Sequence, residues 1–80
     1  MTINDAIASR IIFLLRKNQM TKYRLENNAN IKHSVMFNII SGKNKTITLT
    51  TLFKICNGLN ISILEFLDDD LFNSNNLDYD

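Results

Sequence analysis

Apolar residues recur at helical spacing in the first part of the chain. Six of them form one stripe, at Ile3, Ile7, Ile11, Ile12, Leu14 and Leu15. This spacing predicts a helix over about 3–18. Thr2 is a suitable residue to cap its start, and Asp5 places a negative charge near the positive end of the helix.

Two shorter helices are predicted in the middle of the chain, with a tight turn between them. The first begins after Thr21, which can cap it, and ends near Asn28. The second spans about 32–41 and ends at Gly42, which can take the left-handed conformation of a helix stop. Asn30 can adopt the same conformation in the turn. The apolar residues expected to lock the pair together are Leu25, Ala29, Ile31, Met36 and Ile39.

Two more helices are predicted after a polar loop over 43–47. Thr48 caps the first of them, and Gly58 or Asn60 ends it. Ser62 and Glu65 have the spacing of a capping box and begin the last helix. The apolar residues of these two helices are Leu49, Leu52, Phe53, Ile55, Cys56, Ile63, Phe66 and Leu67. The sequence therefore predicts an all-α fold over 1–72 and, from its Asn, Ser and Asp content, a disordered tail over 73–80.

Composition supports one small helical domain. The chain has 80 residues, no proline and two glycines, and 45% of its residues are hydrophobic. These values favour helices over a multi-turn β fold and exclude a wholly disordered chain. Its single cysteine cannot form an intramolecular disulfide, which suits a cytoplasmic protein. The longest apolar run, 11–15, is too short to span a bilayer, and we expect no membrane association and no signal peptide.

Charge is distributed unevenly along the chain. Residues 1–64 contain all nine basic residues and two acids, a net charge of +7, whereas residues 65–80 contain six acids and no base. A basic body is the expected footprint of a phosphate-binding surface. The alternative is an ordinary solvated surface followed by a solubilising acidic tail, and charge alone leaves both open.

Three features occur together in a specific order. They are the helix pair over 22–38, the dipeptide Gly42-Lys43 directly after it, and the segment 48–62. In this order they resemble the Cro/repressor-type helix-turn-helix family, also called the Xre family, over about 7–67. The resemblance implies a compact five-helix bundle of the lambda-repressor-like type. It also implies a protein that binds double-stranded operator DNA, usually as a symmetric dimer, and regulates transcription.

The resemblance also implies which side chains meet DNA. A recognition helix over about 32–41 would enter the major groove. Its base-contacting residues would be His33, Ser34 and Asn38, with Lys32 and Phe37 as further candidates. Phosphate contacts would come from Lys22, Lys43, Asn44 and Lys45. Each of these residues, Lys45 above all, could instead be an ordinary solvated side chain.

Three positions depart from the family pattern. Glu26 stands where the family usually has a small residue, so it must lean outward or find a partner such as Lys32 or Arg24. Asn30 replaces the usual glycine. Many members pair an arginine of the first helix with a glutamate of the third, and here those positions hold Leu15 and Ile40. An apolar contact between these two would avoid the desolvation of two charges.

Catalysis and metal binding find no support in the sequence, and we expect neither an enzyme nor a cofactor. One histidine and one cysteine far apart do not make a metal site. Cys56 falls on an apolar helix face and is expected to be buried. Three consecutive acids, Asp68, Asp69 and Asp70, would point in different directions on a helix, so a solvated helix end is favoured over a cation site. No separate small-molecule domain fits in this length.

The sequence therefore predicts a small DNA-binding transcriptional regulator that acts as a homodimer on a palindromic operator. The alternative is a protein-interaction module, such as an antitoxin or anti-regulator, that keeps the bundle. Val35 and Phe37 are predicted to face partly outward, where they could meet thymine methyl groups, the next helix or another protein. Together with the unusual Glu26, they are the features that favour the alternative.

Overall fold

The computed structural model describes residues 1–43 and 46–78, and its regular structure is helical. The helices are α1 (Ile3–Lys17), α2 (Lys22–Ala29), α3 (His33–Ile40), α4 (Leu49–Leu59) and α5 (Ile63–Leu67), followed by the short 3-10 helices η1 (Asp70–Phe72) and η2 (Ser74–Asn76). The predicted all-α bundle is confirmed. The α-helix boundaries lie close to those expected from the sequence, because local capping residues fix both ends of most helices.

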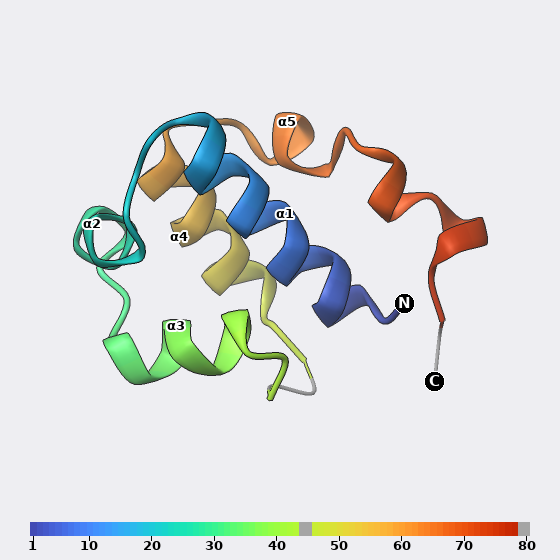
Figure 1. Cartoon of the computed structure of the whole chain (residues 1–80), viewed down its shortest axis with the longest axis horizontal. Coiled ribbons are helices and arrows are strands. Elements are labelled where there is room, and N and C mark those ends of the chain that lie inside the picture. Colours follow the sequence, from blue (N-terminus) through green and yellow to red (C-terminus); the bar gives the residue numbers. More distant parts are fainter. Residues whose placement is uncertain (44–45, 79–80) are drawn as a thin grey trace.

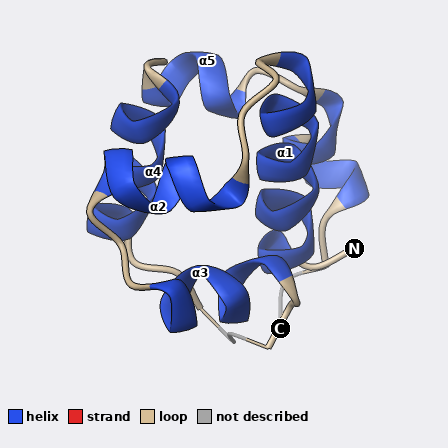
Figure 2. Cartoon of the chain, turned by 60° about the vertical axis from the view of Figure 1, so that its left-hand side comes forward, coloured by secondary structure: helices blue, strands red, loops and turns tan. Residues whose placement is uncertain are grey.

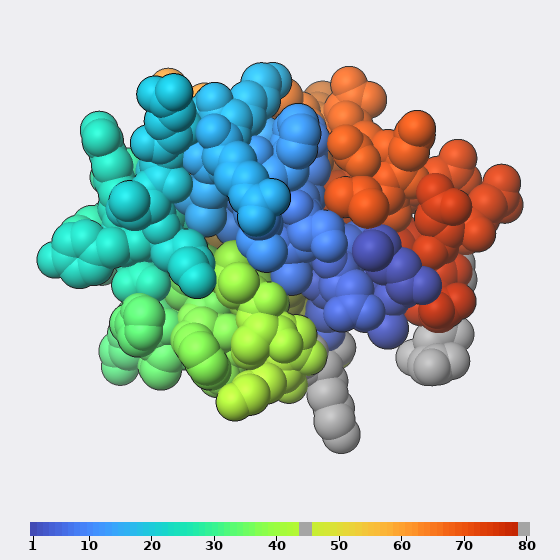
Figure 3. Space-filling view, in the orientation of Figure 1, coloured from blue at the N-terminus to red at the C-terminus, as the bar shows by residue number. Residues whose placement is uncertain are grey.

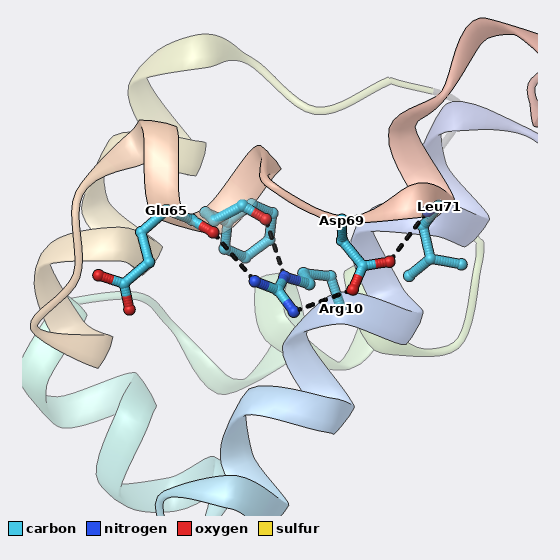
Figure 4. A network of polar contacts seen from close by, with 5 residues as sticks. Arg10, Glu65, Asp69 and Leu71 are labelled. Carbon is cyan, nitrogen blue, oxygen red and sulfur yellow. Dashed lines mark hydrogen bonds and ion pairs between the residues drawn. The ribbon is translucent and has the colours of Figure 1, made fainter.

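Each predicted N-cap is present. The side-chain hydroxyls of Thr2, Thr21, Thr48 and Ser62 each accept a hydrogen bond from the backbone amide three residues later. Thr2 and Asp5 form a complete capping box at the start of α1. At α5 the serine half of the predicted capping box is formed, because the Ser62 hydroxyl accepts a hydrogen bond from the Glu65 amide. The Glu65 carboxylate itself points away from the Arg10 guanidinium (Figure 4).

Left-handed residues follow or end four of the helices, and Gln19 does so after α1 with φ 52°. Asn30 ends α2 with φ 55°, and Asn60 ends α4 with φ 60°. Gly42 follows α3 with φ 75°, and the amides of Gly42 and Lys43 donate to the carbonyls of Ile39 and Asn38. This is the double hydrogen bond of a Schellman motif. Gly58, the other candidate for the end of α4, lies inside that helix.

Gly58 is required by a close approach between α4 and α2. A Cβ atom at position 58 would lie 2.8 Å from Leu25 Cδ1 and 2.9 Å from Ala29 Cβ. The side-chain amide of Asn28 also donates to the Gly58 carbonyl at 3.3 Å. Because glycine has no side chain, α2 can pack closely against the α4 backbone at this point, and a larger residue at position 58 would push the two helices apart.

One hydrophobic core joins all five helices. The buried cluster draws on α1 (Ile7, Ile11, Leu14, Leu15), α2 (Leu25, Ala29), α3 (Met36, Ile39), α4 (Leu52, Ile55, Cys56, Leu59) and α5 (Phe66). Leu15 belongs to this cluster, and Ile40 packs against it half-buried, as an apolar replacement of the family ion pair requires. Leu49 and Phe53 do not belong to it. They are 66% and 45% exposed, so the core-facing side of α4 is narrower than its apolar pattern suggests.

A buried arginine ties α1 to the C-terminal part of the chain. Arg10 Nε donates to the Phe66 carbonyl at 2.8 Å, Nη2 donates to the Glu65 carbonyl at 2.9 Å, and Nη1 lies 3.2 Å from Asp69 Oδ2 (Figure 4). The two carbonyls belong to the end of α5, where the Glu65 carbonyl also accepts a hydrogen bond from the Asp68 amide. From the sequence, Arg10 was counted only among the basic residues, and this role was not predicted.

The last described residues return to the N-terminus. The Asp78 amide donates to the Met1 carbonyl at 2.8 Å, and the Asp78 carboxylate lies 2.9 Å from the N-terminal ammonium. Residues 73–78 thus follow a defined path that includes η2, whereas the disorder expected over 73–80 stays a prediction. Both ribbon views place α3 at the opposite end of the molecule from α5 (Figures 1 and 2).

Candidate nucleic-acid interface

The interface candidate is built on α2, the turn after it, and α3. The Thr21 hydroxyl caps α2, so Lys22 is the first helical residue. The left-handed Asn30 reverses the chain, and α3 then begins at His33. Lys32 is the N-cap of α3 but makes no side-chain capping hydrogen bond. This geometry leaves the first turn of α3 open at the surface.

The two sides of α3 differ sharply in exposure. Met36 and Ile39 are each 1% exposed and anchor the helix in the core. On the other side, His33, Ser34, Val35 and Phe37 are exposed, and Asn38 is half-buried. The prediction that Val35 and Phe37 face outward is confirmed, with exposures of 38% and 52%. The helix therefore presents a mixed polar and apolar ridge outward.

Glu26 has a partner other than the two expected from the sequence. Its side chain is buried, with 7% exposure, and its Oε2 and Oε1 atoms lie 3.0 and 3.2 Å from Nδ1 of His33. The suggestion of Lys32 or Arg24 as its partner was wrong. Those residues are close in sequence, but α2 and α3 bring the first residue of α3 onto the Glu26 carboxylate instead.

Three lysines among the predicted DNA contacts lie at the surface. Lys22, Lys32 and Lys43 are all exposed. The Lys43 ammonium lies 5.0 Å from the centroid of the Phe37 ring, a cation–π distance that joins the end of α3 to the chain after it. The remaining two predicted phosphate contacts, Asn44 and Lys45, lie outside the described residues.

The acidic part of the chain lies elsewhere on the surface. In the space-filling view the cyan to yellow-green residues of α2 and α3 cover the left and lower part, and the orange to red C-terminal residues cover the upper right (Figure 3). Glu65, Asp68, Asp69, Asp70 and Asp78 belong to that C-terminal part. The α2–α3 surface is therefore separated from them, which suits a polyanionic partner.

No second chemical site emerges from the described residues. Within residues 1–43 and 46–78, no group of three His, Cys, Asp or Glu side chains could hold a metal ion. Asp68, Asp69 and Asp70 do not continue a helix. Asp68 and Asp69 lie between α5 and η1, where Asp69 caps η1 and contacts Arg10, and Asp70 is the first residue of η1. Cys56 is buried as predicted, and that burial raises the pKa of its thiol.

Within residues 1–43 and 46–78, no helix has the length and apolar character needed to cross a membrane.

A helical bundle in which a tight turn joins two helices, here α2 and α3, and the second of them is exposed on one side defines a helix-turn-helix protein. A model of the Cro/C1-type HTH DNA-binding domain matches residues 10–70. The chain belongs to that family, as its resemblance to the Cro/repressor type predicted.

A solved structure supports the same assignment. The crystal structure of the prophage Lp1 protein 11 is similar with a TM-score of 0.82 and 26% identity, over 92% of this chain and 97% of that chain. A search of curated proteins found no match. The family and the fold together support a DNA-binding regulator.

Proposed function

We propose that this protein is a sequence-specific transcriptional regulator that inserts α3 into the major groove of operator DNA. The observation that carries the proposal is the exposure of His33, Ser34 and Phe37 on the side of α3 opposite the core residues Met36 and Ile39. Asn38 and Lys32 flank these side chains. Asparagine can pair with adenine through two hydrogen bonds, and an exposed aromatic ring can meet a thymine methyl group.

Phosphate contacts fix the protein on the duplex in this proposal. Lys22 is exposed at the start of α2, where free backbone amides add positive potential. Lys43, Asn44 and Lys45 follow α3 and would meet the backbone on the other side of the groove. Such contacts position the protein without reading bases.

A dimer is part of the same proposal. One α3 offers few base-contacting side chains, so a single bundle has little surface for specific binding. Two copies on a palindromic operator would read half-sites about 10 base pairs apart, one helical turn of DNA. The spacing of the two half-sites reports the symmetry of the dimer directly, whichever surface joins the two copies.

Selection of bound sites from a randomised duplex pool tests the proposal. We expect one half-site, repeated as an inverted pair at a fixed spacing, and affinity that falls steeply with salt concentration. Failure to enrich any sequence, with no salt-dependent binding to duplex, would overturn the proposal.

The exposed aromatic ring of Phe37 supports a second candidate function. A module that binds a protein, such as an antitoxin or anti-regulator, could bury this ring and Val35 in its partner. In that case duplex binding would be weak at all salt concentrations, and a protein partner would protect the α3 amides from hydrogen exchange.

A further inference from the structure

The pair between Glu26 and His33 joins a buried charge to an exposed ring. The Glu26 side chain is 7% exposed, while the His33 side chain is 80% exposed. The contact runs from both carboxylate oxygens to a single ring atom, Nδ1, at 3.0 and 3.2 Å. One end of the imidazole is therefore held from within the protein, and the other end faces outward.

This contact determines which ring nitrogen carries the hydrogen. An ionised carboxylate can only accept hydrogen bonds, so Nδ1 of His33 must be the donor. In the neutral ring the other nitrogen, Nε2, then carries no hydrogen and is an acceptor. Nε2 makes no hydrogen bond to residues 1–43 or 46–78, so it is free to meet a ligand.

We propose that Glu26 is a positioning residue for base recognition, which holds His33 with Nδ1–H turned inward and presents Nε2 to DNA as an acceptor. This inference rests on the proposed function, because it assigns a base preference to the α3 surface. Glu26 touches no base in this arrangement and acts only through the imidazole.

The chemistry of Nε2 identifies the group that His33 reads. In the major groove, only the exocyclic amino groups of adenine and cytosine donate hydrogen bonds, whereas guanine offers two acceptors. An acceptor at Nε2 therefore favours adenine or cytosine at the contacted position. Without Glu26, the ring is free to place its hydrogen on Nε2, and this donor would favour guanine.

The α2–α3 packing makes Glu26 suited to this role. Its carboxylate is carried by a helix that packs closely on α4 at Gly58, where a Cβ atom would lie 2.8 Å from Leu25 Cδ1 and 2.9 Å from Ala29 Cβ. The partner, His33, is the first residue of α3 and lies at the end of the helix that enters the groove. A buried carboxylate can thus orient a ring that is otherwise solvated.

Nitrogen NMR of the free protein tests the first step. The chain contains one histidine, so its two imidazole nitrogens give unambiguous 15N signals. At pH 8 we expect Nδ1 to be protonated and Nε2 to be bare, and we expect Glu26→Ala to move both signals toward a mixture of tautomers. A ring with its hydrogen on Nε2 in the unaltered protein would overturn the inference.

Site selection with three variants tests the second step. Glu26→Ala should shift preference at one base pair of each half-site from adenine or cytosine toward guanine, by about three- to tenfold. The double variant Glu26→Ala, His33→Ala should show no preference at that pair. Glu65→Ala is the matched control, because it removes the same side chain from an exposed position on α5, and it should leave every base preference unchanged.

The outcomes separate this inference from the proposed function. If the unaltered protein selects a site but Glu26→Ala leaves the base preferences unchanged or weakens all sequences equally, the positioning role is wrong and the regulator proposal stands. If the unaltered protein selects no DNA sequence, the regulator proposal fails, and the base-reading inference fails with it whatever the tautomer.

Discussion

The two buried charged residues of the described chain, Arg10 and Glu26, have the same solvent exposure but different kinds of hydrogen-bond partner. Each is 7% exposed. Arg10 is surrounded by fixed acceptors, two backbone carbonyls at the end of α5 and the Asp69 carboxylate. Glu26 has a single exposed ring as its partner. A charge held by the main chain stabilises the bundle, whereas a charge that holds a surface side chain can control what that side chain presents.

The largest expected effect comes from a buried charge that has no partner at all. Leu15→Arg places a guanidinium in the core cluster against which Ile40 packs, and we expect a loss of about 4 kcal/mol in unfolding free energy. Urea denaturation measures it. The double variant Leu15→Arg, Ile40→Glu should recover part of the loss, because it restores the ion pair that many family members have. An unchanged melting temperature for Leu15→Arg would contradict the packing of Leu15 in this core.

A slightly smaller loss is expected when Arg10 is removed. Arg10→Ala leaves the carbonyls of Glu65 and Phe66 and the Asp69 carboxylate without this donor, and we expect about 3 kcal/mol of destabilisation. Hydrogen exchange should increase first in α5 and η1. Arg16→Ala, an exposed arginine of the same helix, should change stability by less than about 0.5 kcal/mol. Equal effects of the two substitutions would show that Arg10 has no special role.

The Glu26–His33 pair should respond asymmetrically to the loss of either member. His33→Ala leaves a buried carboxylate without this partner, at an expected cost of about 2 kcal/mol. Glu26→Ala leaves only a solvated imidazole and removes a buried charge, so we expect a change within about 1 kcal/mol. Thermal unfolding of both variants and of the double variant measures the difference. Two equal losses would mean that the pair stabilises the fold in the way Arg10 does.

The exposed lysines should have the smallest effect on the fold and a clear effect on DNA. Lys22→Ala or Lys43→Ala should weaken binding similarly on all sequences and reduce the slope of log affinity against log salt by about one unit. Fluorescence anisotropy at several salt concentrations measures this slope. Lys54→Ala, which removes a lysine outside the proposed interface, should not change it. A substitution that altered base preference alone would show that the lysine reads bases.

The parts of this molecule that sequence reasoning predicted well are those fixed by local contacts. The N-caps at Thr2, Thr21 and Thr48 depend on groups three residues apart, and the left-handed Asn30 depends on its own side chain. Most core positions follow from helical spacing, although Ile3 and Leu67 of the same apolar patterns are 43% and 40% exposed. The α3 residues that face outward follow from the same spacing.

Interactions between distant segments were not predictable in the same way. Helical spacing places Arg10 on the same face as Ile7 and Leu14, unlike Arg16, but its partners lie 55 to 59 residues away and cannot be identified from its neighbourhood. The partner of Glu26 depends on the angle between two helices. Leu49 and Phe53 continue an apolar pattern beyond the part of α4 that other helices cover. Glu26 at a position where the family usually has a small residue was the one available signal, and it indicated the need for a partner, although the two suggested partners, Lys32 and Arg24, were wrong.

The stacking of Lys43 on Phe37 also gives the protein a natural place for an optical reporter. The chain contains no tryptophan, so Phe37→Trp would introduce a single indole on the outer side of α3, beside the ammonium group that now lies 5.0 Å from the phenyl ring. Its emission would register directly whether that side of the helix is in water, against nucleobases or against another polypeptide.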